Sequence, residues 1–115
     1  MARTTRPISW IKAARKAFEA FPEAVQLEAL RALTIAAEGQ KSDIAKPMQG
    51  LGSGIMEIAL RHRGDAWRMV YAVQIGTDIW VIHAFQKKSK SGIATPKQEI
   101  DLIRDRIKRL QEMLR

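Results

Sequence analysis

Hydrophobic and polar residues alternate along the stretch from Ile55 to Lys90, and this alternation predicts three consecutive β-strands. β-Branched and aromatic side chains, which favour strands, are frequent in this stretch. We expect the strands at Ile55–His62, Trp67–Gln74 and Ile79–Gln86. Arg63-Gly64-Asp65 and Gly76-Thr77-Asp78 separate them and supply the glycine that tight hairpin turns favour. The rest of the chain is organised around this three-stranded meander.

A two-residue loop at Gly64-Asp65 assigns each side chain to a face, because successive side chains on a strand point in opposite directions. With a similar loop at Gly76-Thr77, an apolar core face holds Met56, Ile58, Leu60, Trp67, Met69, Tyr71, Val73, Trp80, Ile82 and Ala84. The opposite face holds Glu57, Ala59, Arg61, Arg63, Arg68, Val70, Ala72, Val81, His83, Phe85 and Lys87. In this register Arg61 lies directly across from Arg68.

Like charges that face each other on a sheet are unfavourable, so the cationic face needs an explanation. One interpretation is a solvated face whose arginines extend into water. The other is an anion site, because planar guanidinium groups suit phosphate oxygens and Phe85 offers a surface on which a base can stack. Both interpretations remain open at this point, and both depend on the two-residue loops.

Helical spacing follows a short strand predicted at Ile8–Ile11. A first helix carries one apolar stripe, and Pro22 ends it; the stripe is Ile11, Ala14, Phe18 and Phe21. A second helix at about Pro22–Glu38 stops at Gly39 and carries Val25, Leu27, Leu30, Leu33 and Ala37. The two helices make a hairpin that we expect to cover Ile58, Met69 and Ile82, leaving Arg61 and Arg68 on the opposite face.

A last helix is predicted from Thr95 to about Met113, with Thr95 as the N-cap and Pro96 at the first position. Its apolar residues keep strict three-four spacing at Ile100, Ile103, Ile107, Leu110 and Leu114. Two heptads are too few to favour a coiled coil, so the stripe predicts packing against the sheet or a partner. The pattern gives one domain, residues 1–115, of the α/β (α+β) class.

The connection Gly39–Gly54 is long, polar and rich in glycine, and we expect it to be ordered but adaptable. Its glycines at 50, 52 and 54 do not have the spacing of a P-loop or a dinucleotide fingerprint, and a strand follows rather than a helix. The chain has no cysteine, and its two histidines lack the spacing of a zinc site. We therefore expect no metal and no cofactor.

The net charge of +8, from 20 Lys and Arg against 12 Asp and Glu, predicts a polyanionic partner. Nucleic acid, the ribosome, an acidic protein and an anionic membrane surface all fit this charge. No apolar run is long enough to span a membrane, and the basic N-terminus lacks the apolar segment of a secretory signal. The N-terminus also loosely resembles a transit peptide, although the same residues fit a strand and a helix.

Three segments of the chain resemble the RelE/ParE superfamily of toxins from bacterial toxin–antitoxin pairs, and within it the phage-derived Gp49-like, HigB-type branch. The segments are KPMQGLGSGIMEI (Lys46–Ile58), WRMVYAV (Trp67–Val73) and HAFQKKSKSGIATP (His83–Pro96). The resemblance implies a small α/β toxin fold with a helical hairpin on one face of an antiparallel sheet and a concave basic face opposite. It also implies a cytoplasmic toxin with a cognate helix-turn-helix antitoxin.

The activity that the resemblance implies is cleavage of mRNA in the ribosomal A site, which would make the protein an endoribonuclease without a cofactor. ParE-like inhibition of DNA gyrase is the alternative within the superfamily, and a basic RNA-binding module without catalysis is the alternative outside it. Arg68 falls where the family places a phosphate-stabilising arginine, and Arg61 falls where RelE has a lysine proposed as general base. Lys87 or Lys88 matches the basic residue after the last strand.

The chemistry constrains these roles further. Arginine stays protonated near neutral pH, so Arg61 suits anion binding better than proton abstraction. His83 titrates near neutrality and is either the acid or base of the reaction or a structural residue. Glu57 is either a base or the counter-ion of Arg61 or Arg63, Tyr71 is expected to pack in the core, and His62 to lie at a strand end. The catalytic candidates are Arg68, Arg61, His83 and Lys87, and the RNA-binding candidates are Arg63, Phe85, Lys88, Lys90 and Lys46.

Overall fold

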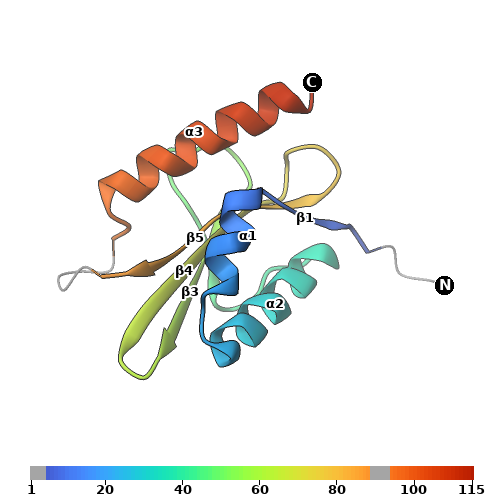
Figure 1. The fold of residues 1–115 in the computed structure, drawn as a ribbon. Coiled ribbons are helices and arrows are strands. Elements are labelled where there is room, and N and C mark those ends of the chain that lie inside the picture. Colours follow the sequence, from blue (N-terminus) through green and yellow to red (C-terminus); the bar gives the residue numbers. More distant parts are fainter. Residues whose placement is uncertain (1–4, 89–93) are drawn as a thin grey trace.

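Three helices and a five-stranded sheet make up the computed structural model, which describes residues 5–88 and 94–115 (Figure 1). The elements follow one another as β1 (Ile8–Trp10), α1 (Lys12–Glu19), α2 (Glu23–Ala37), β2 (Ala45–Pro47), β3 (Ile55–His62), β4 (Asp65–Ala72), β5 (Ile79–Lys87) and α3 (Lys97–Met113). The strand order is β1-β5-β4-β3-β2, in which β1 runs parallel to β5 and all other pairs are antiparallel. The predicted α+β class and the meander are confirmed.

The β3–β4 hairpin turns one residue earlier than predicted. Its loop is Arg63-Gly64, and both residues have positive φ, 52° and 85°, as a type I′ turn requires. The prediction of a Gly64-Asp65 loop was therefore wrong, and so was the Arg61–Arg68 pair: Arg68 lies opposite Ala59, and Arg61 opposite Ala66. The register shifts by two residues, which is a whole period of a strand, so each side chain keeps its predicted face.

A register shift between β4 and β5 changes the predicted faces of β5. The ladder pairs Val70 with His83 but Tyr71 with Val81, which leaves Ile82 as an extra residue on β5. Ile79 and Val81 consequently pack with the helical hairpin, whereas Trp80 and Ile82 pack with α3. The predictions that placed Trp80 and Ile82 on the hairpin side and Val81 on the opposite side were wrong.

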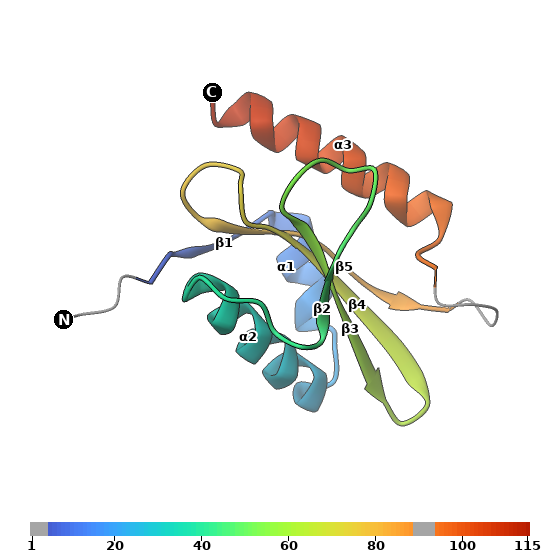
Figure 2. The same ribbon diagram turned by 180° about the vertical axis from the view of Figure 1, so that it is seen from behind.

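The sheet separates two hydrophobic clusters. The larger lies under α1 and α2 and includes Phe18, Val25, Leu33, Ile58 and Met69. The smaller lies under α3 on the other face and includes Leu51, Val70, Ile103, Ile107 and Leu110. Figures 1 and 2 show the helical hairpin and α3 on opposite sides of the sheet. The face predicted to be polar is therefore partly buried by α3.

Two features of the helices and connections differ from the sequence-based expectation. Leu27 and Leu30 were placed on the apolar stripe of α2, but they are 52% and 38% exposed. The long connection contains an unpredicted strand, β2, which pairs with β3 and so adds an edge to the sheet. Gly54 ends this connection with a φ of 74°, and a Cβ atom there would lie 2.8 Å from the Gln74 side chain.

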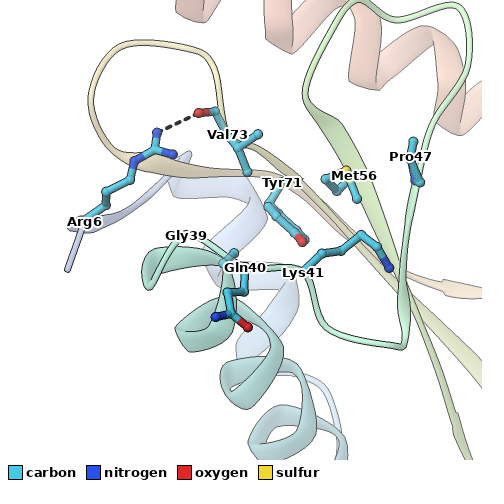
Figure 3. A pocket seen from close by; sticks show the side chains of 9 residues that line it. Arg6, Gly39, Gln40, Lys41, Pro47, Met56, Tyr71 and Val73 are labelled. Atoms are coloured by element: carbon cyan, nitrogen blue, oxygen red, sulfur yellow. Dashed lines mark hydrogen bonds between the residues drawn. The ribbon is translucent and has the colours of Figure 1, made fainter. Parts of the chain in front are cut away.

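Arg6 connects the N-terminal segment to the loop between β4 and β5 through hydrogen bonds. Its guanidinium donates hydrogen bonds to the carbonyl oxygens of Val73 (2.7 Å), Thr77 (2.9 Å) and Asp78 (3.0 Å). Figure 3 shows the contact with Val73, at the edge of a pocket of about 380 Å³ that Tyr71 also lines. The backbone N–H of Arg6 donates to the carbonyl oxygen of Ala37 (3.0 Å), which adds the end of α2 to this junction.

We predict that Arg6→Ala lowers the free energy of unfolding by about 2–3 kcal/mol, because a charged donor is lost from three carbonyl groups. Urea unfolding monitored by circular dichroism measures the change. The control is Arg31→Ala, which removes an exposed arginine of α2 and should change stability by less than about 0.5 kcal/mol. Equal stability of the two variants would contradict the proposed role of Arg6.

Candidate functional site

The strand register brings most of the candidate residues to one face of the sheet in three rows. The first row crosses β2 to β5 and consists of Lys46, Glu57, Val70 and His83. The second consists of Ala59, Arg68 and Phe85, and the third of Arg61, Ala66 and Lys87. Residues paired across strands share a face. We call the seven polar or aromatic members of these rows the polar sheet face: Lys46, Glu57, Arg61, Arg68, His83, Phe85 and Lys87.

Arg68 lies in the middle row and is held by Glu57. The Nη1 atom of Arg68 donates to the carboxylate of Glu57 at 3.0 Å, and the two side chains are 13% and 14% exposed. The hydroxyl of Thr95 donates to the other carboxylate oxygen at 2.5 Å. Glu57 is a counter-ion, but the predicted partners Arg61 and Arg63 were wrong: Glu57 pairs with Arg68.

Thr95 consequently does not serve as the predicted N-cap of the last helix. The N-cap residue is Pro96, the helix starts at Lys97, and no side chain caps it. The hydroxyl of Thr95 is used for the Glu57 carboxylate instead. This contact fixes the start of α3 beside the Glu57–Arg68 pair.

His83 connects β5 to α3 through both ring nitrogens. Nε2 lies 3.1 Å from a carboxylate oxygen of Glu99, and Nδ1 lies 3.0 Å from Nη1 of Arg106. Because Arg106 can only donate, Nδ1 of His83 is an acceptor. Nε2 therefore carries the ring hydrogen and donates it in a hydrogen bond to the Glu99 carboxylate. Arg106 also donates to the carbonyl oxygen of Ile82 (3.1 Å), the extra residue of the register shift.

Burial lowers the pKa of His83 below its ordinary value of 6.5. Glu99 raises this pKa through its hydrogen bond and charge, and the positive charge of Arg106 lowers it, but burial is the largest influence. The ring also stacks on Phe85 with a centroid distance of 5.0 Å and an interplanar angle of 21°. His83 is 6% exposed. His83 is therefore enclosed and held by Glu99 and Arg106 of α3 and by the ring of Phe85.

The other candidates differ in how far they face solvent. Arg61, Lys46 and Lys88 are exposed, whereas Lys87 is only 8% exposed. Arg63 is exposed in the β3–β4 turn, beyond the third row. Lys90 lies outside the described residues. The exposed cations therefore surround a more enclosed centre formed by Arg68, Phe85 and Lys87.

Two residues have the structural roles that the sequence predicted. Tyr71 is 1% exposed in the cluster under the helical hairpin, and burial raises the pKa of its phenol. His62 is half-buried at the end of β3, opposite Asp65. Neither residue belongs to the polar sheet face.

Sequence reasoning missed Glu99 and Arg106, the two residues of α3 that contact His83. A signal was present: positions 99, 103, 106 and 110 follow the three-four spacing that places them on the buried side of the helix, with Ile103 and Leu110. Charged residues at such positions need partners in the interior. The sequence does not show which residue is that partner, because the face on which His83 lies depends on the register between β4 and β5.

The donor atoms of the site suit anions rather than metal ions. In residues 5–88 and 94–115, no three His, Cys, Asp or Glu side chains are close enough to hold a metal.

None of the helices in these ranges combines the length and apolar character needed to cross a bilayer.

Comparison with known proteins defines the class of the chain. Among solved structures, a mutant of the toxin RelE from E. coli, in the free state, matches with a TM-score of 0.63 and 16% sequence identity. The match covers 91% of this chain and 97% of that one, so the two proteins share a fold. No curated protein matches the sequence.

A family model gives the finer classification. Residues 16–108 match the family described as Phage derived protein Gp49-like (DUF891), and the chain belongs to this family. The family is one of RelE-like toxins, which confirms the resemblance seen in the sequence. The chain therefore belongs to a family of toxins of the toxin–antitoxin type, a class that implies an antitoxin partner.

We predict that acidification weakens the fold through His83. Because its pKa is lower in the folded protein than in the unfolded chain, the unfolded state binds the proton first, and stability falls as the pH drops below about 6.5. Urea unfolding of wild type and His83→Gln between pH 5.5 and 7.5 measures this. The variant should show a shallower pH dependence, although Glu99 and Arg106 still face the position. An unchanged pH dependence would contradict the prediction.

Proposed function

We propose that the chain is a toxin that binds mRNA on its polar sheet face and cleaves it on the ribosome. The observation that carries the proposal is the gathering of Lys46, Arg61, Arg68 and Lys87 on one face, with the aromatic ring of Phe85 opposite Arg68. Guanidinium and ammonium groups bind phosphates, and an aromatic ring gives a base a stacking surface. Membership of a RelE-like toxin family supports the same reading.

RNA cleavage by internal transfer needs three events: the ribose 2′-OH loses its proton, the phosphorane charge is stabilised, and the 5′-oxygen gains a proton. We assign charge stabilisation to Arg68, which is already fixed by Glu57 and so needs little reorganisation. Arg61 and Lys46 bind neighbouring phosphates, because both are exposed cations. Arg63 and Lys88 extend this binding surface, and Lys90, outside the described residues, stays an RNA-binding candidate from the sequence.

The proton transfers have fewer candidates. Glu57 is the carboxylate beside Arg68, and to accept the 2′-OH proton it would have to give up the hydrogen bond from Thr95. Lys87, in the third row beside Phe85, is our candidate for protonating the 5′-oxygen. A catalytic role for His83 would require it to give up its contact with Glu99 or with Arg106.

The modest set of acids and bases favours dependence on the ribosome. Positioned acids and bases each contribute roughly 10²–10⁴-fold, and correct orientation of the RNA alone contributes several kcal/mol. A ribosome that holds the codon in place supplies this orientation. The location that follows from this proposal is the bacterial cytoplasm.

We predict that Arg68→Lys lowers RNA cleavage by about 10²-fold and relieves growth inhibition, because lysine keeps the charge but lacks the planar fork. Arg68→Ala is less suitable, since it leaves the enclosed Glu57 carboxylate without its cation and costs about 1–3 kcal/mol of stability. The assay induces each variant without antitoxin and maps new mRNA 5′-ends. Arg31→Lys, an exposed change on α2, is the matched control.

The same assay separates the alternatives. Codon-phased 5′-ends in wild type that disappear in Arg68→Lys support the nuclease. Growth arrest with a trapped gyrase–DNA complex and no new ends would favour ParE-like inhibition. A wild type that neither arrests growth nor cleaves RNA would leave only a basic RNA-binding module.

We also predict that the purified protein cleaves mRNA on programmed ribosomes at least about 10²-fold faster than the same mRNA free in solution, because the ribosome orients the substrate. The two rates are compared at equal mRNA concentration, with Arg68→Lys as the blank in both. Equal rates on both substrates would refute the dependence on the ribosome and leave the nuclease assignment intact.

A further inference from the structure

A groove of about 530 Å³ lies between the start of α1 and the C-terminal half of α3, away from the Glu57–Arg68 pair. Its apolar lining comes from Trp10, Trp80, Leu102, Leu110 and Met113. Two other pockets among the described residues, one of them shown in Figure 3, are smaller, with volumes of about 380 Å³. The groove therefore offers the larger recess, and two indole rings line it.

The end of α3 adds unusual apolar exposure at the mouth of the groove. Met113, which lines the groove, is 65% exposed, and the next residue, Leu114, is 42% exposed. Large apolar side chains next to tryptophan-lined recesses are typical of protein contact sites, where tryptophan is enriched among the residues that dominate binding. Exposing these apolar side chains to water is unfavourable, so a partner that covers them would explain their presence at the end of α3.

The rim of the groove is cationic. Lys12, Arg106 and Arg109 contribute three positive charges, and Asp105, which pairs with Arg109 at 3.2 Å, contributes one negative charge. The first turn of α1 contains no acidic residue. An occupant with apolar side chains flanked by carboxylates would match both the lining and the rim.

We propose that this groove holds an amphipathic, acidic segment of the antitoxin. The inference rests on the proposed function in one respect, because it takes the partner of a toxin to be its antitoxin. An RNA segment fits less well, since the apolar residues Leu102, Leu110 and Met113 give phosphates no partner.

The groove and the polar sheet face meet at one residue. The side chain of Arg106 lines the groove, while its guanidinium donates to His83 and to the carbonyl oxygen of Ile82. Lys12 and Met113 line the groove and belong to none of the three rows of the polar sheet face. Changes at these two residues therefore test the groove without altering the proposed RNA site.

The experiment titrates the purified protein encoded beside the toxin gene against wild type, Met113→Glu and Lys12→Glu by isothermal calorimetry. We expect Met113→Glu to raise the dissociation constant at least tenfold and Lys12→Glu to raise it several-fold, because both place a carboxylate against an acidic segment. The matched controls are Leu27→Glu, a 52% exposed leucine of α2, and Lys16→Glu, an exposed lysine of α1 outside the groove. Both controls should bind within twofold of wild type.

Cleavage of mRNA on programmed ribosomes is measured for the same five proteins and should not differ among them. Wild-type affinity in both groove variants, a loss of affinity in Leu27→Glu instead, or no binding by wild type would overturn the proposal. Loss of RNA cleavage in Met113→Glu with antitoxin binding intact would also overturn it, because the groove would then serve RNA. If wild type cleaves no RNA but the groove variants still lose the antitoxin, the proposed function fails and this inference stands.

Discussion

The register shift between β4 and β5 is the constraint on which the arrangement of both sheet faces depends. Before the shift, Ile79 and Val81 of β5 pack under the helical hairpin and Trp80 packs under α3. After the shift, His83, Phe85 and Lys87 lie on the same face as Arg68. Without the extra residue, Trp80 and Ile82 would lie with Ala84 on the hairpin side. The cluster under α3 would then lack the β5 residues on which Ile103 and Ile107 pack.

The shift also explains why a charged residue lies on the inner side of α3. The carbonyl oxygen of Ile82 falls where the ladder is irregular, and Arg106 donates to it as well as to His83. Burial of a guanidinium is unfavourable without partners, and the contacts of Arg106 with His83 and with the carbonyl oxygen of Ile82 offset that cost. These contacts, the His83–Glu99 contact and the Thr95–Glu57 hydrogen bond tie α3 to the sheet. The apolar cluster and these polar contacts together keep α3 over part of the polar sheet face.

The sequence predicted the existence of the meander, the hairpin and the last helix because their periodicities of two and 3.6 are long and regular. It also assigned the faces of β3 and β4, since an error of two residues in the strand register leaves the face of each side chain unchanged. The turn itself was misplaced because Arg63 adopts a positive φ that non-glycine residues seldom take. No local pattern marks the extra residue of β5 or the short edge strand β2, since both depend on pairing with distant residues.

The candidate site was predictable in its residue types but not in its contacts. Arg68 lies on the face predicted to be polar, yet its side chain is only 13% exposed and pairs with Glu57 of β3, which in turn accepts a hydrogen bond from Thr95. Lys46 pairs with Glu57 across the β2–β3 ladder, and Arg61 lies further along the same face as an exposed cation. Exposed cations that share a face repel one another, and a bound anion would relieve this repulsion. The two hydrophobic clusters on either side of the sheet stabilise the scaffold that carries these charges.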